Sequence, residues 1–304
     1  MLGRVCSIFV KTFQLLHGDC MAAQILDGMK IASSIEEDVK RVLSNSDVKP
    51  SIVFFVVGDN QATKVYVRKK QEACERVGIL SNVVSFNGDV SENELIEKIQ
   101  EVNSSNTTGI IVQLPLPKHI NENLVVSSIS TEKDVDCMHP ENIGKLLYSS
   151  ELVPCTVSGI MRLIEETGTN VAGKNVTVIN RRHIGKCLSI LLLNMKATVS
   201  VCGRNSQLEL YTKHADIVIS AAGSPGLIKR DMIKPGAVVI DVGISMYEGK
   251  IRGDVDDNVR DIASFVTPVP GGVGPMTVAM LMKNTSDMAV RNSISHDLYK
   301  KHNI

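Results

Sequence analysis

The sequence lacks the features that mark several protein classes. Lys and Arg together number 33, as do Asp and Glu, so no net charge draws the chain to nucleic acid or to a membrane surface. No apolar run is long enough to span a bilayer. We therefore expect a small-molecule partner, with no nucleic acid and no membrane.

Patterns for disulfides and metals are also missing. The seven cysteines are scattered, odd in number and never spaced as C-x-x-C, and the seven histidines show no H-x-x-x-H spacing. Reduced thiols fit this distribution better than disulfides or a zinc site. We expect no bound metal.

What is present is enough apolar sequence for two hydrophobic cores. A length of 304 residues exceeds the usual size of one domain, and 43% of the residues are hydrophobic against 22% charged. These values are typical of an ordered chain with two domains.

The first twenty residues allow two interpretations. Arg4, Lys11 and His17 precede the first acid, Asp19, as in a mitochondrial leader. In contrast, Met21 and the residues after it read as an ordinary protein start. A leader and an untargeted extension both stay open, and the predicted location is cytoplasmic or mitochondrial.

Short apolar runs rich in β-branched residues alternate with polar, helix-compatible stretches. In the first half of the chain, strands are expected at 51–57, 79–86 and 109–113, with helices at 61–77 and 92–102. In the second half, strands are expected at 175–179, 198–202, 217–220 and 237–242, with a helix at 184–194. Continuous hydrophobicity within the strands predicts parallel sheets covered by helices on both faces.

This alternation predicts an α/β fold of two α/β domains, the second a Rossmann-type doubly wound parallel sheet. We expect an N-terminal extension at 1–20, a first domain at 21–155 and a second domain at 156–277. A C-terminal helix at 278–304 is expected to pack back on the first domain.

Tyr66 and Lys70 are four residues apart in the predicted helix at 61–77, so both side chains project from one face. A buried lysine amine can transfer protons, and an aromatic ring beside it offers a flat ligand a stacking surface. The alternative is an ordinary solvated helix, which the basic neighbours Arg68 and Lys69 favour.

Two further segments carry polar groups that suit a ligand. Gln113 ends a predicted strand, where ligands gather in open α/β sheets, and its neutral amide can orient a lysine amine. The alternative is a plain turn, made rigid by the prolines that follow. Asp134 and Asp136 point the same way in an extended segment and then suit an amino-rich heterocycle, although a solvated acidic loop would look the same.

Residues 268–277 read Pro-Val-Pro-Gly-Gly-Val-Gly-Pro-Met-Thr. So many glycines and prolines are unusual in a plain linker, and glycines let the main chain approach a flat ligand closely. Thr277 is placed to cap the helix that we expect to follow.

Together these segments resemble the family of bifunctional methylenetetrahydrofolate dehydrogenase/cyclohydrolases. Residues 58–70 resemble its VGDxPAS-x-x-Y-V-x-x-K segment, 112–117 its VQLPLP, 133–136 its KDVD and 268–277 its PVPGGVGPMT, in the same order. PCT at 154–156 and AVVIDVG at 237–243 also match, so the resemblance covers about residues 25–285.

The resemblance implies a function. The chain would oxidise 5,10-methylenetetrahydrofolate to the methenyl form with NADP and hydrolyse that product to 10-formyltetrahydrofolate, as a homodimer with folate in a cleft between the domains. Tyr66 would stack on the folate, and Lys70, tuned by Gln113, would transfer protons in the hydrolysis. The predicted pterin contact is Asp136, and the remaining predicted substrate residues are Pro270, Gly271, Gly272 and Val273.

The cofactor end departs from the family pattern V-x-G-R-S-x-I-V-G-x-P. Residues 178–187 read V-I-N-R-R-H-I-G-K-C, one residue shorter, with Asn180 in place of the turn glycine. Asparagine tolerates positive φ, so we expect Asn180 to keep the turn. The next strand ends without Asp or Glu and is followed by Arg204, which favours the 2′-phosphate of NADP over NAD. The predicted cofactor residues are Asn180, Arg181, Arg182, Gly185, Arg204, Ala222, Gly223, Ile244 and Thr277.

Two smaller departures lie nearer the predicted folate site. Val157 replaces the proline of the family's PCTP, and Cys137-Met138 replaces Gly-Phe. Cys137 adds a side chain beside Asp136, and we expect it to alter the fit of the folate.

Three other functions stay open. The shortened loop fits a cyclohydrolase whose dehydrogenase site is impaired, with the arginines as plain surface charges. It also fits a non-catalytic folate-binding partner. A different Rossmann-type dehydrogenase that uses a Tyr/Lys pair receives no support from the order of the motifs.

Overall fold

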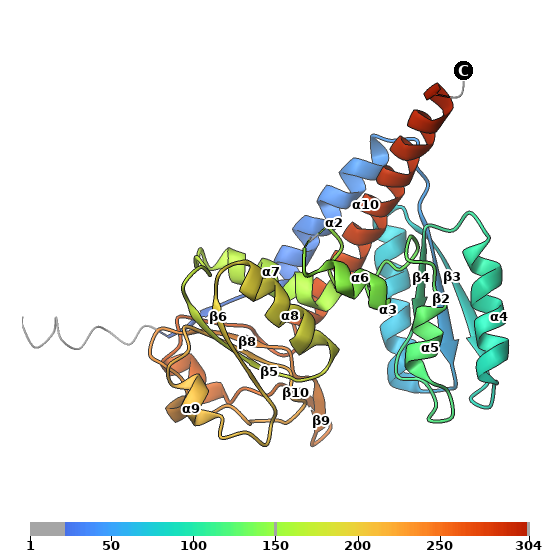
Figure 1. Cartoon of the computed structure of the whole chain (residues 1–304). Coiled ribbons are helices and arrows are strands. Elements are labelled where there is room, and N and C mark those ends of the chain that lie inside the picture. The colour runs from blue at the N-terminus through green and yellow to red at the C-terminus, as the bar shows by residue number, and fades with distance from the viewer. Residues whose placement is uncertain (1–21, 149–150, 303–304) are drawn as a thin grey trace, which may run out of the picture.

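The computed structural model describes residues 22–148 and 151–302, and it confirms two α/β lobes (Figure 1). The N-terminal extension expected at 1–20, whether a leader or untargeted, lies outside the described residues. Within the described part of the chain, no helix is long and apolar enough to cross a membrane.

The first lobe is built on three parallel strands in the order β3-β2-β4. In the central strand, Ile52, Phe54 and Phe55 are fully buried, because helices cover both faces of the sheet. The elements of this lobe are β2 (Ser51–Val57), α3 (Gln61–Val77), β3 (Leu80–Phe86), α4 (Glu92–Asn103), β4 (Gly109–Val112), α5 (Glu122–Ser127) and α6 (Pro140–Lys145).

The second lobe holds six parallel strands in the order β1-β11-β8-β7-β5-β6. An antiparallel hairpin of β9 and β10 follows β8. The elements here are β1 (Gln24–Ile25), α7 (Cys155–Glu166), β5 (Asn175–Ile179), α8 (His183–Asn194), β6 (Thr198–Cys202), α9 (Glu209–Thr212), β7 (Ile217–Ser220), η1 (Arg230–Met232), β8 (Val238–Asp241), β9 (Ser245–Tyr247), β10 (Lys250–Arg252), η2 (Asp257–Asp261) and β11 (Phe265–Val266).

The start of the described chain belongs to the second sheet, since β1 pairs with β11. From there α2 (Gly28–Ser44) begins at Asp27, whose carboxylate accepts the amide of Met29 at 3.0 Å. A Cβ on Gly28 would lie only 1.9 Å from the Gly272 carbonyl oxygen. This close backbone contact fixes the start of α2 against residues 271–272 and so joins the two lobes.

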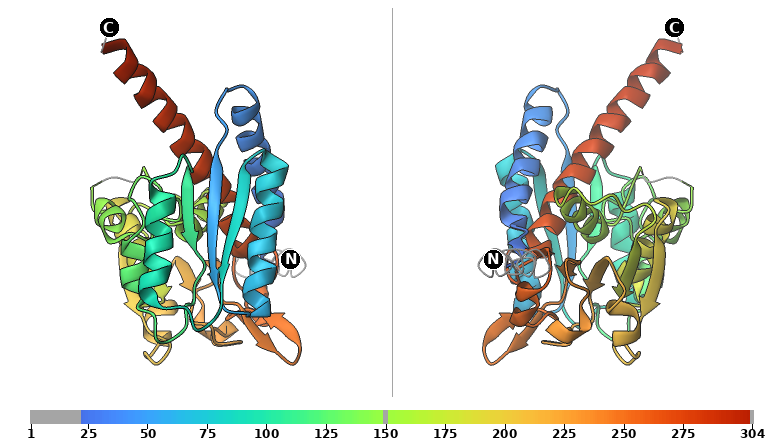
Figure 2. Two further views of the ribbon diagram at one scale, coloured as in Figure 1. Left: turned by 90° about the vertical axis from the view of Figure 1, so that its right-hand side faces the viewer. Right: turned by 90° about the vertical axis from the view of Figure 1, so that its left-hand side faces the viewer.

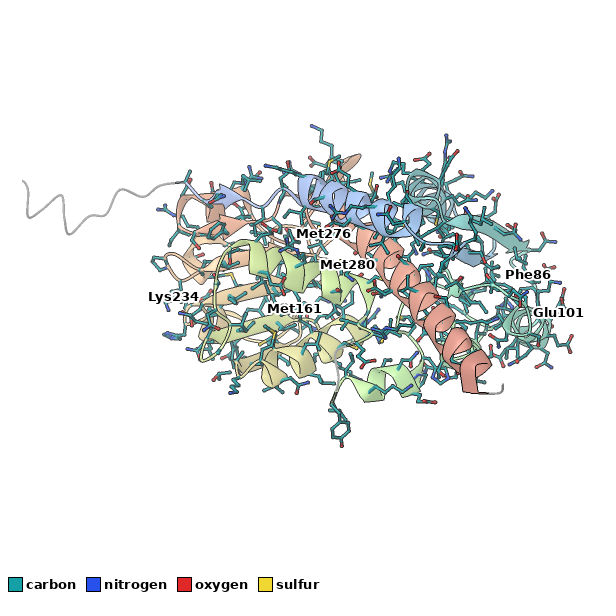
Figure 3. The ribbon with its side chains drawn as sticks, turned by 90° about the horizontal axis from the view of Figure 1, so that it is seen from above. Phe86, Glu101, Met161, Lys234, Met276 and Met280 are labelled. Carbon is teal, nitrogen blue, oxygen red and sulfur yellow. The ribbon has the colours of Figure 1, made fainter. Side chains whose placement is uncertain are left out.

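The long helix α10 (Val273–His302) lies beside α2 and contributes to both cores. Met276 packs in the core of the second lobe with Met161, whereas Met280 packs in the core of the first lobe (Figure 3). Figure 2 shows this helix, in red, leaving both lobes at its C-terminal end. The two lobes are therefore held together by α2 and α10.

One expectation about α10 is wrong. Thr277 does not cap the helix, because the helix already begins at Val273. The Thr277 hydroxyl instead donates to the Val273 carbonyl, one turn back, at 3.2 Å.

Candidate active site

Lys70, Gln113 and Tyr66 meet at the side of the first lobe where α3 contacts α10. The Lys70 side chain is only 5% exposed, and its Nζ donates to Gln113 Oε1 at 3.0 Å. Gln113 Nε2 donates to the Leu114 carbonyl at 3.0 Å, which turns Oε1 toward the amine. The same Nζ lies 5.1 Å from the centroid of the Tyr66 ring.

Lys70 is therefore no part of a solvated helix face. Its neighbours Arg68 and Lys69 are exposed, as that interpretation requires, but Lys70 itself is buried. An ammonium has three donors, and Gln113 uses one. The amine is thus held by a neutral acceptor, and its other donors can face a ligand.

Tyr66 is a poor acid or base at this site. Burial, and less strongly Asp136 and Cys155, raise the pKa of Tyr66 to about 12, against a smaller opposing effect of a hydrogen bond with Thr277. The phenol is thus neutral near pH 7. Tyr66 suits stacking against a flat ring, and a dehydrogenase that uses tyrosinate as its base does not fit this site.

Asp134 and Asp136 do not act as a pair. Asp134 is 1% exposed and accepts the amides of Met138 at 2.9 Å and His139 at 2.8 Å, so it holds the turn together. The segment is a turn and not an extended strand, so the alternation that would point both carboxylates the same way is absent. Asp136 is half-buried and lies close enough to Tyr66 to affect its pKa. Only Asp136 remains for a ligand.

Cys137 occupies the position where the family pattern has glycine, and its backbone φ is 54°, in the left-handed region. Its side chain is fully buried, and the thiol donates to the Leu152 carbonyl at 3.5 Å. The added side chain therefore points into the protein. Replacing glycine by Cys137 therefore places a non-glycine residue in a left-handed backbone conformation, and it does not place a side chain in the site.

Contacts between α10 and the turn around Asp136 complete this site. Asn284 Nδ2 donates to the carbonyls of Val135 at 3.0 Å and Val153 at 3.1 Å. The hydroxyls of Thr277 and Thr156 lie 3.2 Å apart, within hydrogen-bonding distance. Sequence analysis missed Asn284, because a single polar residue within a helix gives no pattern, and it included Thr156 only as part of the PCT match.

Residues 270–272 are part of the connection from β11 to α10, which begins at Val273. Gly271 has φ 104°, which only glycine adopts readily, and a Cβ on Gly272 would lie 2.6 Å from the Pro268 carbonyl oxygen. Val273 is buried in the core of the second lobe. Gly271 and Gly272 thus allow a tight turn of the backbone. The main chain of this segment then lies against the start of α2.

The expectation that Asn180 adopts positive φ is wrong. Asn180 is not among the described residues with positive φ. Its side chain makes the turn instead: Oδ1 accepts the amides of Arg182 at 2.8 Å and Gly185 at 3.2 Å, and Nδ2 donates to the Ala221 carbonyl at 2.7 Å. Asparagine replaces a glycine turn here by hydrogen bonding at the start of α8.

The loops that hold the predicted cofactor residues follow neighbouring strands of one sheet. We call them the cofactor loops: 180–185 after β5, 203–206 after β6, 221–224 after β7 and 243–244 after β8. Because the strands are parallel, all four loops lie at the same edge of the sheet, where dinucleotides bind in such folds. Thr277 lies apart from them, near Tyr66.

The donors on these loops suit the phosphates of a dinucleotide. Arg181 Nη2 donates to Ser206 Oγ at 3.1 Å, and its guanidinium lies over Gly203, where an added Cβ would be 3.0 Å from Nε. Arg182 and Arg204 are exposed. Three guanidinium groups, with no acid at the end of β6, fit a 2′-phosphate. Sequence analysis missed Ser206, which gives no pattern on its own.

Two family models match the chain. The first, "Tetrahydrofolate dehydrogenase/cyclohydrolase, catalytic domain", matches residues 26–136, and the second, "Tetrahydrofolate dehydrogenase/cyclohydrolase, NAD(P)-binding domain", matches residues 154–293. The Bifunctional protein FolD of Aquifex aeolicus is 50% identical over 273 residues, 86% of this chain and 94% of that protein. The same-named protein of Brevibacillus brevis is 48% identical over 274 residues, 87% and 96% of the two chains.

Solved structures agree with these matches. The crystal structure of the FolD enzyme from Campylobacter jejuni is similar with a TM-score of 0.86 and 42% identity, covering 89% of this chain and 100% of that one. The Trypanosoma brucei enzyme, complexed with NADP cofactor and inhibitor, is similar with a TM-score of 0.85 and 35% identity, covering 90% and 99%.

Proposed function

Because the chain belongs to the tetrahydrofolate dehydrogenase/cyclohydrolase family, we propose that it oxidises 5,10-methylenetetrahydrofolate with NADP and hydrolyses the methenyl product to 10-formyltetrahydrofolate. The observation that carries this proposal is the buried Lys70 amine, held at 3.0 Å by the neutral amide of Gln113 beside the Tyr66 ring. That arrangement serves a proton transfer next to a flat ligand.

The hydrolysis needs a group that carries protons between the attacking water and N5 of the substrate. The methenyl compound is an amidinium cation, and water adds to its central carbon and loses a proton. The hydroxyl of this adduct then loses its proton as the carbonyl forms, while the bond from the same carbon to N5 breaks and N5 gains a proton. We assign the exchange of these protons to Lys70 Nζ, which Gln113 Oε1 orients. One water is consumed and one proton is released in sum.

The substrate is placed by residues that take no part in proton transfer. We propose that Tyr66 stacks on the folate ring system, since it is a neutral phenol, and that Asp136 binds the amino groups of the pterin. Residues 270–273 are assigned to the substrate as main-chain contacts.

NADP, when bound, supplies the acceptor for the hydride that leaves the methylene carbon. We propose that Arg181, Arg182 and Arg204 hold its 2′-phosphate and that the start of α8 near Gly185 holds its diphosphate. Along the rest of the cofactor we place Ala222, Gly223 and Ile244. We assign Thr277, which lies near Tyr66, to the end of the cofactor that meets the substrate.

The first experiment follows methenyl absorbance after the purified chain is mixed with 5,10-methylenetetrahydrofolate and either NADP or NAD. We expect methenyl formation with NADP, followed by its decay. Hydrolysis of supplied methenyltetrahydrofolate without any oxidation would instead identify a cyclohydrolase with an impaired dehydrogenase site. Loss of both reactions would identify a non-catalytic folate-binding protein.

Replacing Arg181 by alanine tests the position of the 2′-phosphate. Loss of a charge-assisted hydrogen bond is expected to raise KM for NADP by about 10- to 100-fold. KM for NAD, which has no 2′-phosphate, should change less than about twofold. Lys213→Ala, an exposed charge paired with Glu209 on α9, is the control and should change neither value. Equal losses for both nucleotides in Arg181→Ala would contradict the assignment.

We also propose that the chain is a homodimer formed through the second domain. β6 is the last strand of its sheet, and the apolar side chains of Leu193, Val201 and Leu210 near it are exposed. Sedimentation velocity should give twice the chain mass of 33.1 kDa. Val201→Asp should give the monomer, and an unchanged dimer in that variant would place the interface elsewhere.

The domain limits follow the same assignment. We propose residues 21–155 as the folate-binding catalytic domain, although β1 pairs in the second sheet, and 156–277 as the NADP-binding domain. We propose 278–304 as the part of the C-terminal helix that returns to the first domain, although α10 already begins at Val273. Location in the cytoplasm or in mitochondria stays a prediction.

A further inference from the structure

Two buried carboxylates, Asp241 and Asp254, lie outside the site described above. Asp241 ends β8, and Asp254 follows the β9–β10 hairpin (Figure 1). They are 3% and 0% exposed. Neither has a role in the proton transfer or in the binding of substrate, so their presence in the interior needs another explanation.

Asp254 binds the loop that follows β7. Its Oδ2 accepts the Ser220 hydroxyl at 2.8 Å and the Ala222 amide at 2.7 Å, and its Oδ1 accepts the Ser224 amide at 2.7 Å. Gly223, with φ 62°, lies between the last two donors. One carboxylate therefore fixes the backbone on both sides of Gly223.

Asp241 fixes the loop that follows β8 and also holds Asp254. Its Oδ1 accepts the amides of Gly243 and Asp254, both at 2.9 Å, and its Oδ2 accepts the Val255 amide at 2.9 Å. An added Cβ on Gly243 would lie 2.3 Å from Asp254 Oδ1. The loops after β7 and β8 are thus joined through two side chains.

The same set of contacts reaches the loop after β5. Asn180 Nδ2 donates to the carbonyl of Ala221, the residue before the Asp254-bound amide of Ala222. Three of the four cofactor loops are therefore connected, in the order 180–185, 221–224 and 243–244, by the side chains of Asn180, Asp254 and Asp241.

Burying the carboxylates of Asp241 and Asp254 lowers the stability of the fold, so a purely structural role does not explain them. None of the hydrogen bonds described at the two carboxylates comes from a charged donor, and Arg252, close in sequence, pairs with Asp257 instead. Burial, and also the charge of Asp254, raise the pKa of Asp241 to about 6. Buried carboxylates without a cation are normally avoided, and exceptions concentrate at functional sites.

We propose that Asp254 is a positioning residue for the nucleotide: it presets the loop around Gly223 and, through Asp241, the loop around Ile244 in the shape that NADP requires. The inference rests on the proposed dehydrogenase function. Asp254 does not touch the nucleotide, and it acts by holding the amides of Ala222 and Ser224 in place. Its loss should therefore weaken nucleotide binding without affecting hydrolysis at Lys70.

The test is Asp254→Asn, which keeps the size of the side chain but turns an amide donor toward one of its partners. By titration calorimetry we expect NADP to bind about 10- to 100-fold more weakly. Hydrolysis of methenyltetrahydrofolate, which uses no nucleotide, should stay within about twofold. Ser220→Ala, which removes one donor and leaves both amides, should weaken NADP binding by about 3- to 10-fold and covers the case in which Asp254→Asn does not fold.

Asp216→Asn is the matched control, since Asp216 is also a hydrogen-bonded carboxylate of this domain but lies at the opposite edge of the sheet. It should leave NADP affinity unchanged. Unchanged NADP affinity in Asp254→Asn and Ser220→Ala, or equal losses of NADP binding and hydrolysis, would overturn the inference. A wild-type chain that binds no NADP would overturn the proposed dehydrogenase function and this inference with it.

Discussion

Lys70→Ala is expected to lower kcat for the hydrolysis of methenyltetrahydrofolate by about 10²- to 10⁴-fold, the usual contribution of one proton-transfer group. The side chain is buried and held at 3.0 Å by Gln113, whereas the neighbouring Lys69 is exposed to solvent. Oxidation of methylenetetrahydrofolate transfers a hydride and needs no proton carrier at this position. Its rate should therefore fall by less than about tenfold, and stopped-flow absorbance separates the two steps.

Two further variants test whether Lys70 itself carries the proton. Lys69→Ala removes the neighbouring exposed amine and should leave both steps unchanged. Gln113→Glu places a carboxylate where the neutral amide lies, which would hold the ammonium in its charged form and lower hydrolysis although Lys70 is still present. If Lys70→Ala lowered oxidation as much as hydrolysis, Lys70 would be a binding residue and not a proton carrier.

Strand limits follow the β-branched runs of the sequence more closely than they follow burial. The limits expected at 175–179 and 217–220 match β5 and β7, which lie inside the sheet, and the limits expected at 198–202 match β6, although this last strand is mostly exposed or half-buried. β1 was not predicted. Two residues have no periodicity, and their pairing with β11, far away in the sequence, follows from packing alone.

The site residues also divide into those that the sequence predicts and those that depend on packing. Lys70 and Gln113 could be paired from the sequence, since one lies on a helix face and the other at a strand end of the same sheet. The use of Asp134 as a structural acceptor, and the turn that the Asn180 side chain forms, depend on where individual amides point. Short-range patterns do not encode that geometry, which is why both expectations about conformation were wrong.

The two reactions therefore depend on different parts of the fold. The proton carrier lies on α3 and is oriented from the end of β4, whereas the nucleotide depends on loops whose shape is set by Asn180, Asp254 and Asp241. A substitution in the cofactor loops should therefore lower oxidation and leave hydrolysis unchanged. The shortened loop after β5 is the most direct position for such a substitution.

Gly185→Ala is expected to abolish measurable NADP binding, a loss of at least about 100-fold, while hydrolysis continues. An added Cβ would lie 1.8 Å from the Asn180 carbonyl oxygen and 2.6 Å from its carbon, both backbone atoms, so the connection from β5 to α8 must move. Such crowding costs about 1–3 kcal/mol of stability, roughly 3–10 °C in Tm. Calorimetric titration with NADP and thermal denaturation measure the two effects.

Gly144→Ala in α6, where an added Cβ meets nothing within 4 Å, makes the same substitution and should preserve both NADP affinity and stability. Tight NADP binding by Gly185→Ala would show that the loop can shift without cost to the nucleotide, and the diphosphate would then lie away from the start of α8.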